Sequence, residues 1–165
     1  MTLYLPRRFA DQIIARARAD APDECWGLLA GTADRVREVF HLKNGAPPEE
    51  RPFRYSVEPR SFMDASDALY ERGWEILGIY HSHTHTQPYP SPTDIDFANP
   101  DLGDIVYLIA SLRVPSQPFV YRGMDEVARE QVHAFAQTKP ARPELRGWQI
   151  RDGHAEPADL RITRG

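Results

Sequence analysis

The stretch 105–112 constrains the fold of this chain more than any other, because it is apolar at every position except Ser111. A run of this length is far too short to cross a bilayer as a helix and is typical of a buried strand. Its β-branched and aromatic residues also favour a strand. We therefore predict that 105–112 forms a central strand of a β-sheet.

Shorter apolar or alternating runs, each bounded by turn residues, predict the other strands. They lie at 25–30, 35–42, 53–57, 75–81 and 118–122, and Gly31 is expected to begin a turn. Residues 148–150 and 160–163 are expected to pair with each other as edge strands. His81 would stand at the C-terminal end of its strand, followed by a proline-rich loop that runs to Pro92.

Apolar residues at helical spacing predict helices between these strands. The expected helices span 6–21, 59–72, 93–98 and 125–137, and Gly73 is expected to end the second of them. Helices that alternate with strands at this density indicate an α/β or α+β domain. The 165 residues contain no repeat and no linker, so we expect a single domain over 1–165.

The composition argues against several classes of protein. The chain has 20 Lys and Arg residues against 24 Asp and Glu residues, a formal net charge of −4, so we expect no nucleic-acid partner. The apolar stretches are shorter than the roughly 20 residues that span a bilayer, so no membrane association is expected. Cys25 is the single cysteine, which excludes an internal disulfide and a multi-cysteine zinc site. Because the N-terminal segment has no apolar signal-peptide core, we expect a cytoplasmic protein.

The polar segment after the strand 75–81 carries the residues best suited to chemistry. Residues two apart in an extended chain point the same way, so His81 and His83 can direct two imidazoles at one point. Asp94 follows a loop long enough to fold back and stands near the start of a predicted helix. Two imidazoles and one carboxylate suit Zn²⁺ and leave a fourth position for water, as in catalytic zinc sites. We predict one zinc ion per chain, held by these three residues.

A hydrolytic zinc site also needs a base and a donor for the oxyanion. Glu24, directly before the strand 25–30, is the candidate base, and Asp23 is its competitor. Ser91 is the candidate oxyanion donor. The sequence Ser-Pro-x-Asp at 91–94 is also a good helix N-terminus, and Ser91 can cap the helix while Asp94 binds metal.

Together these residues resemble the JAMM signature of MPN+ domains, E…H-[ST]-H-x(7)-S-x-x-D. Glu24, the pair His81-x-His83 and the segment Ser91-x-x-Asp94 agree with that signature at every spacing. Residues 22–31 are similar to the first strand of the family, and 78–80 are similar to the segment before its histidines. The motif-supported core is about 6–122, and the tail after Arg122 matches no motif that we can name.

The resemblance implies a cytidine-deaminase-like fold, a single α/β domain with a mixed β-sheet flanked by helices. It implies a zinc metallo-isopeptidase that cuts the amide bond after the C-terminal Gly-Gly tail of a ubiquitin-like protein. His81, His83 and Asp94 would bind zinc, Glu24 would act as general acid and base, and Ser91 would steady the oxyanion. The short chain is similar to compact prokaryotic members, which process ubiquitin-like or sulfur-carrier proteins and in some cases release a C-terminal cysteine.

Other interpretations remain open at the level of the sequence. The same fold could serve as a zinc-binding scaffold that holds a protein partner, or as a zinc hydrolase of small amides. Many compact members have cysteine directly before the strand glycine, where this chain has Trp26. His85 could be a spare ligand or an exposed loop residue, and Tyr89 could shape the cleft or belong only to the loop. We expect a monomer or a homodimer.

Overall fold

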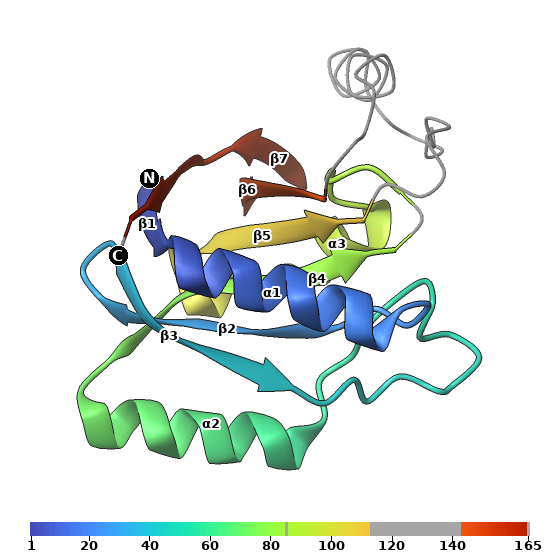
Figure 1. Cartoon of the computed structure of the whole chain (residues 1–165), viewed down its shortest axis with the longest axis horizontal. Coiled ribbons are helices and arrows are strands. Elements are labelled where there is room, and N and C mark those ends of the chain that lie inside the picture. Colours follow the sequence, from blue (N-terminus) through green and yellow to red (C-terminus); the bar gives the residue numbers. More distant parts are fainter. Residues whose placement is uncertain (85, 113–142, 165) are drawn as a thin grey trace.

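The computed structural model describes residues 1–84, 86–112 and 143–164, and these form one β-sheet with helices packed against it (Figure 1). The helices are α1 (Arg7–Asp20), α2 (Pro59–Arg72) and the short α3 (Pro92–Asp96), followed by a 3-10 turn, η1 (Pro100–Leu102). The strands, in chain order, are β1 (Thr2–Pro6), β2 (Trp26–Thr32), β3 (Arg35–Leu42), β4 (Glu75–His83), β5 (Val106–Ser111), β6 (Glu144–Arg151), β7 (His154–Pro157) and β8 (Asp159–Thr163).

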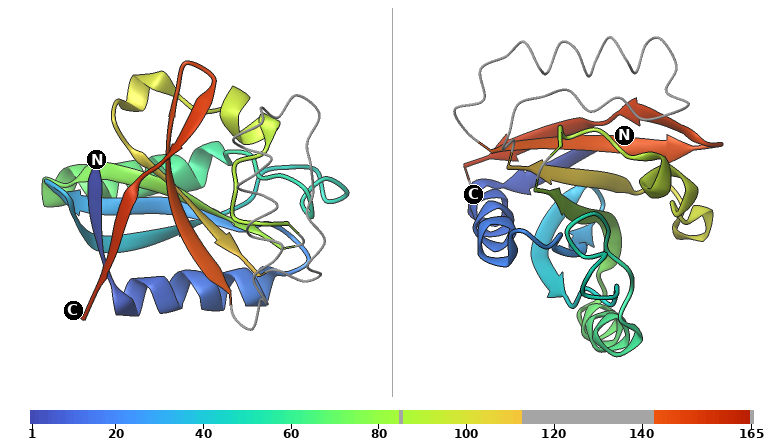
Figure 2. Two further views of the ribbon diagram at one scale, coloured as in Figure 1. Left: turned by 90° about the horizontal axis from the view of Figure 1, so that it is seen from above. Right: turned by 90° about the vertical axis from the view of Figure 1, so that its right-hand side faces the viewer.

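The sheet has the strand order β7-β6-β5-β4-β2-β3-β1-β8. Strand β1 runs parallel to β3 and β8, and β4 runs parallel to β5, whereas the other neighbours are antiparallel. The sheet is therefore mixed, and the predicted α/β fold with flanking helices is confirmed. The sheet also curves strongly (Figure 2), so that the segment before β8 meets β6, where Ala158 N–H donates to Gly147 O at 2.9 Å.

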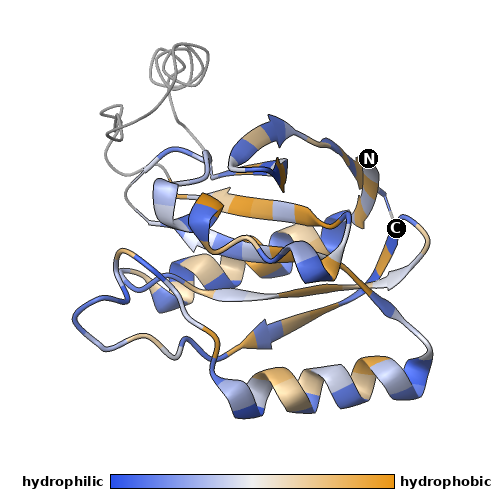
Figure 3. Ribbon diagram, turned by 180° about the vertical axis from the view of Figure 1, so that it is seen from behind, coloured by the Kyte–Doolittle hydropathy of each residue, from blue (hydrophilic) through white to orange (hydrophobic). Residues whose placement is uncertain are grey.

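Side chains that alternate along the strands divide the core between the two faces of the sheet. On one face, Phe9 and Ile13 of α1 pack with residues such as Leu29 and Leu108. On the other face, Ala65 and Leu69 of α2 pack with residues such as Leu28, Ile79 and Ile109. Figure 3 shows the mixed hydropathy of α2, which contributes its buried residues Ala65 and Leu69 to this second core. Both faces of β5 are buried, which explains why its sequence is almost continuously apolar.

Several elements agree closely with the sequence prediction. The helix 59–72 and the strand 35–42 have the predicted bounds, and 106–111 is a central strand between β4 and β6. Gly73 ends α2 in the left-handed conformation, with φ 62°, and its N–H donates to the carbonyl oxygens of the last turn. Such a residue is a common helix stop because glycine has no Cβ to clash there.

The predicted strand at 53–57 is wrong. These residues form a loop in which only Val57 makes a β-bridge, to Asn44. The loop backbone finds part of its hydrogen bonds with the side chain of Asn44, which bonds Arg54 O and Ser56 N–H. Alternating apolar residues therefore occur here without a sheet ladder, because a polar side chain supplies partners that a neighbouring strand would otherwise provide.

Other strand predictions need correction. The sequence pattern does not predict strand β1 at 2–6, and Pro6 ends this strand instead of beginning the helix. The turn after β2 begins after Thr32 rather than at Gly31, and β4 continues through His83. The segments 148–150 and 160–163 do not pair with each other: β6 pairs with β5 and β7, and β8 pairs with β1. These pairings join residues far apart in sequence, which local patterns do not report.

The predicted strand 118–122, the predicted helix 125–137 and His85 lie outside the described residues. Within the residues that the structure describes, no helix combines the length and the apolar character needed to cross a membrane.

Candidate metal centre and active site

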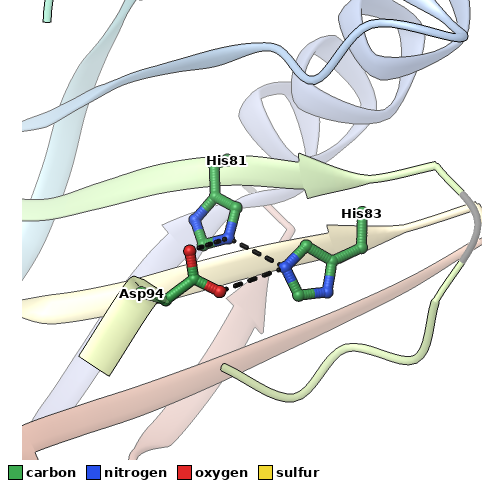
Figure 4. Close-up of side chains that lie close together, drawn as sticks. All are labelled: His81, His83 and Asp94. Carbon is green, nitrogen blue, oxygen red and sulfur yellow. Dashed lines mark hydrogen bonds and ion pairs between the residues drawn. The ribbon is translucent and has the colours of Figure 1, made fainter. Parts of the chain in front are cut away.

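The two histidines stand at the C-terminal end of β4, between β2 and β5. Because they are two residues apart on an extended strand, their side chains leave the same face of the sheet, the one that α2 covers. His81 is 1% exposed and His83 is 3% exposed. Asp94 comes from α3, which follows the loop after β4, and its carboxylate faces both rings (Figure 4).

The three side chains bring possible ligand atoms to one point. His81 Nε2 and His83 Nε2 are 3.0 Å apart, His81 Nε2 is 3.3 Å from Asp94 Oδ1, and His83 Nε2 is 3.3 Å from Asp94 Oδ2. Metal–ligand bonds of about 2.0–2.1 Å in tetrahedral geometry separate the ligand atoms by roughly 3.3 Å. The spacing of this cluster therefore fits a zinc ion that all three residues share.

Hydrogen bonds around the cluster orient two of the three ligands. His83 Nδ1 lies 2.8 Å from Gln87 O, so this nitrogen carries the proton and Nε2 presents a lone pair to the centre of the cluster. Asp94 Oδ2 accepts from Ser91 N–H at 2.7 Å. His81 Nδ1 is buried and has no hydrogen-bond partner among the described residues.

The charges of the cluster act on each other. Burial raises the pKa of Asp94, but the charges and hydrogen bonds of His81 and His83 outweigh burial and hold it well below its usual value. Burial lowers the pKa of His83, but the hydrogen bond and charge of Asp94 raise it above its usual value. His83 thus takes a proton where the site lacks a cation, and metal binding would release that proton.

Glu24 lies next to this cluster, just before β2. Strand β2 pairs with β4 in the register Trp26↔His81, and Ser82 N–H donates to Cys25 O, so Glu24 lies opposite His83. Its side chain is buried, with 7% exposed, and burial raises its pKa to about 8, to which the charge of Asp94 adds while that of His83 opposes. A carboxyl group with a pKa near neutral can both take and give a proton at physiological pH.

Ser91 is the N-cap of α3. Its hydroxyl Oγ accepts from Asp94 N–H at 3.1 Å, while its own N–H holds the Asp94 carboxylate, which completes a capping box. The cap therefore positions the metal-ligand candidate directly. Because the cap uses an acceptor lone pair of the hydroxyl, the O–H proton stays available for donation.

Aromatic rings pack against one side of the cluster. The ring of Tyr55 lies 5.0 Å from the His81 ring and stacks at 5.2 Å on Trp26, measured between ring centroids. Burial raises the pKa of Tyr55 well above its usual value, and the charges of Asp94 and Glu24 add to this effect. Tyr55 therefore stays neutral, and its ring and Trp26 form a wall on which His81 packs.

A cavity of about 470 Å³ opens beside Asp94. Its lining is mainly apolar and aromatic and comes from β2, the loop 53–57, α2, β4, α3 with the segment after it, and β5. It includes these side chains: Trp26, Tyr55, Phe62, Ile79, Phe97 and Tyr107. Phe53 and Phe97 are 77% and 72% exposed, although they line this cavity. Exposed aromatic side chains around a cavity mark a surface that can bind a ligand.

The loop after β4 is held by the neighbouring strands. Trp148 Nε1–H of β6 donates to Pro88 O at 2.9 Å, and its ring packs edge-on against Tyr89 at 4.9 Å between centroids. Ser111 Oγ donates to Thr86 O at the end of β5. Tyr89 is buried against Trp148, so it belongs to the support of this loop.

The structure thus brings together all five site residues that the sequence selected: Glu24, His81, His83, Ser91 and Asp94. Sequence reasoning missed the contributions of Asn44, Tyr55 and Gln87. Asn44 carries only the signal of a turn residue before Gly45. Gln87 acts through its backbone oxygen, for which the sequence has no signal.

Comparison with known proteins places the chain in a family. A sequence model described as "Prokaryotic homologs of the JAB domain" matches residues 6–124. A "CysO-cysteine peptidase" from Mycobacterium bovis is 32% identical over 133 residues, which cover 78% of this chain and 88% of that protein. A "Probable TtuB-protein conjugate cleaving protease" from Thermus thermophilus is 36% identical over 83 residues, or 50% of this chain, and the match spans only 54% of its length.

A solved structure agrees with the fold. The solution structure of a Desulfitobacterium hafniense protein superposes with a TM-score of 0.72 at 24% identity and covers 100% of this chain and 94% of that chain. The family match extends over most of the chain and includes both the strand that follows Glu24 and the segment from His81 to Asp94. The chain therefore belongs to the prokaryotic JAB-domain family, the compact prokaryotic branch of the JAMM/MPN+ proteins.

Proposed function

We propose that this protein is a zinc-dependent peptidase or isopeptidase. It would hydrolyse the amide bond that follows the C-terminal Gly-Gly tail of a ubiquitin-like or sulfur-carrier protein. The observation that carries this proposal is the convergence of His81 Nε2, His83 Nε2 and the Asp94 carboxylate at zinc spacing, beside the buried carboxyl group of Glu24. Two relatives, a CysO-cysteine peptidase and a probable TtuB-protein conjugate cleaving protease, support the substrate class.

His81, His83 and Asp94 would hold the metal. When bound, zinc supplies a Lewis acid that polarises a carbonyl group and lowers the pKa of water. The Asp94 carboxylate and the deprotonated Nε2 atoms suit this ion, and the hydrogen bond from His83 to Gln87 keeps one of these nitrogens in the required tautomer.

Glu24 would accept the proton of the attacking water and return it to the leaving amine. Its burial supports this role, because a carboxyl group with a pKa of about 8 is a stronger base than an exposed one. A divalent cation at the neighbouring cluster would lower this pKa, so that the carboxylate form is present at neutral pH. Asp23, the competing acid, carries no resolved interaction with the cluster, and we assign it no catalytic role.

Ser91 would donate its O–H to the oxyanion that forms at the scissile carbonyl. Its Oγ already accepts from Asp94 N–H, which fixes the hydroxyl beside the metal ligand. A donor held before the reaction starts costs little reorganisation in the transition state, and such donors contribute strongly to catalysis.

The cavity beside Asp94 would receive the extended chain of the substrate. Its apolar lining suits aliphatic side chains that precede a thin glycine tail, and its volume is within the usual range for binding pockets. Arg54 lines the cavity, and its buried Nε–H has no hydrogen-bond partner among the described residues.

The proposal is tested with carrier-protein fusions that end in Gly-Gly, followed either by a single cysteine or by a lysine-linked peptide. We expect the wild-type protein loaded with zinc to cleave at least one fusion after Gly-Gly. Chelation should abolish cleavage. Glu24→Gln should keep about one zinc per chain but lower the rate by a factor on the order of 10²–10⁴, the usual contribution of a general base.

Asp23→Asn is the matched control, because it removes the neighbouring carboxylate and should retain wild-type activity and zinc. Equal activity of Glu24→Gln and the wild type would exclude Glu24 as the base. Zinc binding without cleavage of either fusion would contradict the peptidase proposal and favour a scaffold. Cleavage of small amides alone would instead point to a hydrolase without a protein substrate.

A further inference from the structure

Asn44 follows β3 and joins four backbone groups through one side chain. Its Nδ2 donates to Glu24 O at 2.9 Å and to Arg54 O at 3.1 Å. Its Oδ1 accepts from Ala46 N–H at 2.9 Å and from Ser56 N–H at 3.2 Å. A primary amide has two N–H donors and two acceptor lone pairs, so this side chain uses its full capacity.

One half of this network holds the backbone that carries Glu24. Strands β2 and β3 pair in the register Trp26↔Leu42, so Asn44 lies opposite Glu24, just beyond the end of the ladder. The amide replaces the missing strand partner of Glu24 O. On the other side of the same residue, Glu24 N–H donates to Arg51 O at 2.7 Å. The peptide groups on both sides of the Glu24 side chain are therefore bonded to the loop 44–57.

The other half of the network holds the loop on both sides of Tyr55. Arg54 and Ser56 are its chain neighbours, and each has a backbone group bonded to Asn44. The Tyr55 ring packs on His81 at 5.0 Å between centroids. A single amide thus connects the residue that we propose as the base with the residue that packs on one of the metal-ligand candidates.

We propose that Asn44 is a positioning residue for the reaction, which sets the place of the Glu24 carboxylate relative to His81, His83 and Asp94. This inference rests on the function proposed above. Catalytic groups work only when supporting hydrogen bonds hold them close to the productive geometry. The side chain of Asn44 bonds backbone groups of Glu24, Arg54 and Ser56. Its effect would therefore pass through the backbone that carries Glu24 and through loop residues 54 and 56, which line the cavity.

Two substitutions separate the two bonds that the amide donates from the two that it accepts. Asn44→Asp retains the acceptor oxygens for Ala46 and Ser56 but loses the N–H donors to Glu24 O and Arg54 O. Asn44→Ala loses all four bonds. We expect both variants to bind zinc as the wild type does, to keep KM within about threefold, and to lower kcat at least about tenfold, a modest share of what misplaced catalytic groups cost.

Trypsin provides a measurement that does not depend on activity. Arg54 lies in the loop, and cleavage of the Arg54–Tyr55 bond under native conditions, followed by mass spectrometry, reports loop opening. We expect Asn44→Ala to accelerate this cleavage about tenfold or more and Asn44→Asp to stay within about threefold of the wild type. Leu69→Val, in the core under α2, is the control for a general loss of stability and should leave kcat unchanged.

A kcat within twofold of the wild type for Asn44→Asp would overturn the proposal, as would a loss of activity that only follows the loss of zinc. Leu69→Val should lower Tm without lowering kcat. If it loses as much activity as an Asn44 variant with the same decrease in Tm, the proposal is also overturned, because the effect on activity is then a general loss of stability. If the wild type cleaves no carrier fusion, the proposed function fails. The trypsin comparison would then still decide whether the hydrogen bonds of Asn44 hold the loop in place. A cleavage rate of Asn44→Ala equal to that of the wild type would show that they do not.

Discussion

The carboxylate of Asp94 bonds three groups at once. One oxygen lies 3.3 Å from His81 Nε2, and the other lies 3.3 Å from His83 Nε2 and accepts from Ser91 N–H at 2.7 Å. The backbone of Ser91 therefore positions the ligand, while its hydroxyl caps α3 and keeps a proton to donate. Removing the hydroxyl alone separates the support of Asp94 by the Ser91 N–H from the two roles of the hydroxyl, the helix cap and the proposed oxyanion donor.

Ser91→Ala removes Oγ but retains the N–H that holds Asp94. We expect zinc content to stay at the wild-type level, because the ligand keeps its backbone support. We expect kcat to fall by roughly 10²–10³, the usual cost of losing an oxyanion donor. The lost cap should also destabilise the protein by about 1 kcal/mol.

Steady-state kinetics, zinc analysis and urea unfolding of Ser91→Ala test these three expectations. An unchanged kcat together with the loss of stability would leave Ser91 only its role as a cap. A loss of zinc would show that the hydroxyl, rather than the N–H, supports Asp94.

Strand β6 lies outside the motif that carries the metal-ligand candidates, yet it supports the loop next to them. Trp148 donates to Pro88 O and packs on Tyr89, next to Gln87, whose carbonyl oxygen accepts from His83 Nδ1. The orientation of one histidine therefore depends on a strand more than 60 positions later in the chain. Removing a group that holds a metal ligand in place typically lowers the affinity for the metal.

Trp148→Phe should keep most of the aromatic packing and remove the N–H bond to Pro88 O. Leaving this carbonyl without its partner should cost about 1–3 kcal/mol, part of which weakens the loop that holds His83. We expect zinc to bind roughly 10-fold more weakly, at the lower end of the effect of such outer contacts.

Competition with a chromophoric chelator measures this affinity. Trp74→Phe, which changes a half-buried tryptophan beside α2, is the matched control and should bind zinc as the wild type does. Equal zinc affinity of Trp148→Phe and the wild type would exclude this role for β6.

The folded protein contains buried ionisable groups whose contribution to the free energy of unfolding depends on pH. Burial raises the pKa of Glu24 from 4.5 to about 8. The pKa of His83 is also raised above 6.5, because Asp94 outweighs the effect of burial. In both cases the folded chain holds a proton at pH values where the unfolded chain has lost it. The free energy of unfolding of the metal-free protein therefore decreases as pH rises.

For Glu24 this decrease begins near pH 4.5 and continues to about pH 8, and for His83 it begins near pH 6.5. We expect the Tm of the metal-free wild type to fall across this range. Glu24→Gln should reduce the fall below about pH 6.5, where the contribution of Glu24 decreases with pH and that of His41, whose pKa is lowered by burial, increases. Zinc should reverse the trend, because it binds deprotonated histidine and stabilises the folded state by mass action.

Thermal unfolding with and without zinc, at closely spaced pH values, measures both effects. The Tm of Asp94→Asn should not respond to zinc, since one ligand is lost. A metal-free Tm that rises between about pH 5 and pH 8 would contradict the sign derived for Glu24.

The amino-acid sequence determined the features that depend on neighbours along the chain. The period of apolar residues defined α2 and β3 to the residue, and the apolar run of β5 marked a central strand. The i, i+2 spacing of His81 and His83 on a strand placed both imidazoles on one face, and the Ser-Pro-x-Asp segment set Asp94 in the first turn of a helix. These signals are local because side-chain direction follows from the backbone of a few residues.

Only the tertiary structure decided the features that join distant segments. Strand β1 pairs with β8, and Trp148 supports the loop next to His83. Asn44 bonds both Glu24 and the loop 53–57. Each of these contacts joins segments that are separated in the chain. A backbone carbonyl such as Glu24 O or Gln87 O has the same chemistry in every residue, so its partner depends on which segments the folded sheet brings together. The physical reason is that each buried polar group needs a partner, and the sequence pattern does not specify which one.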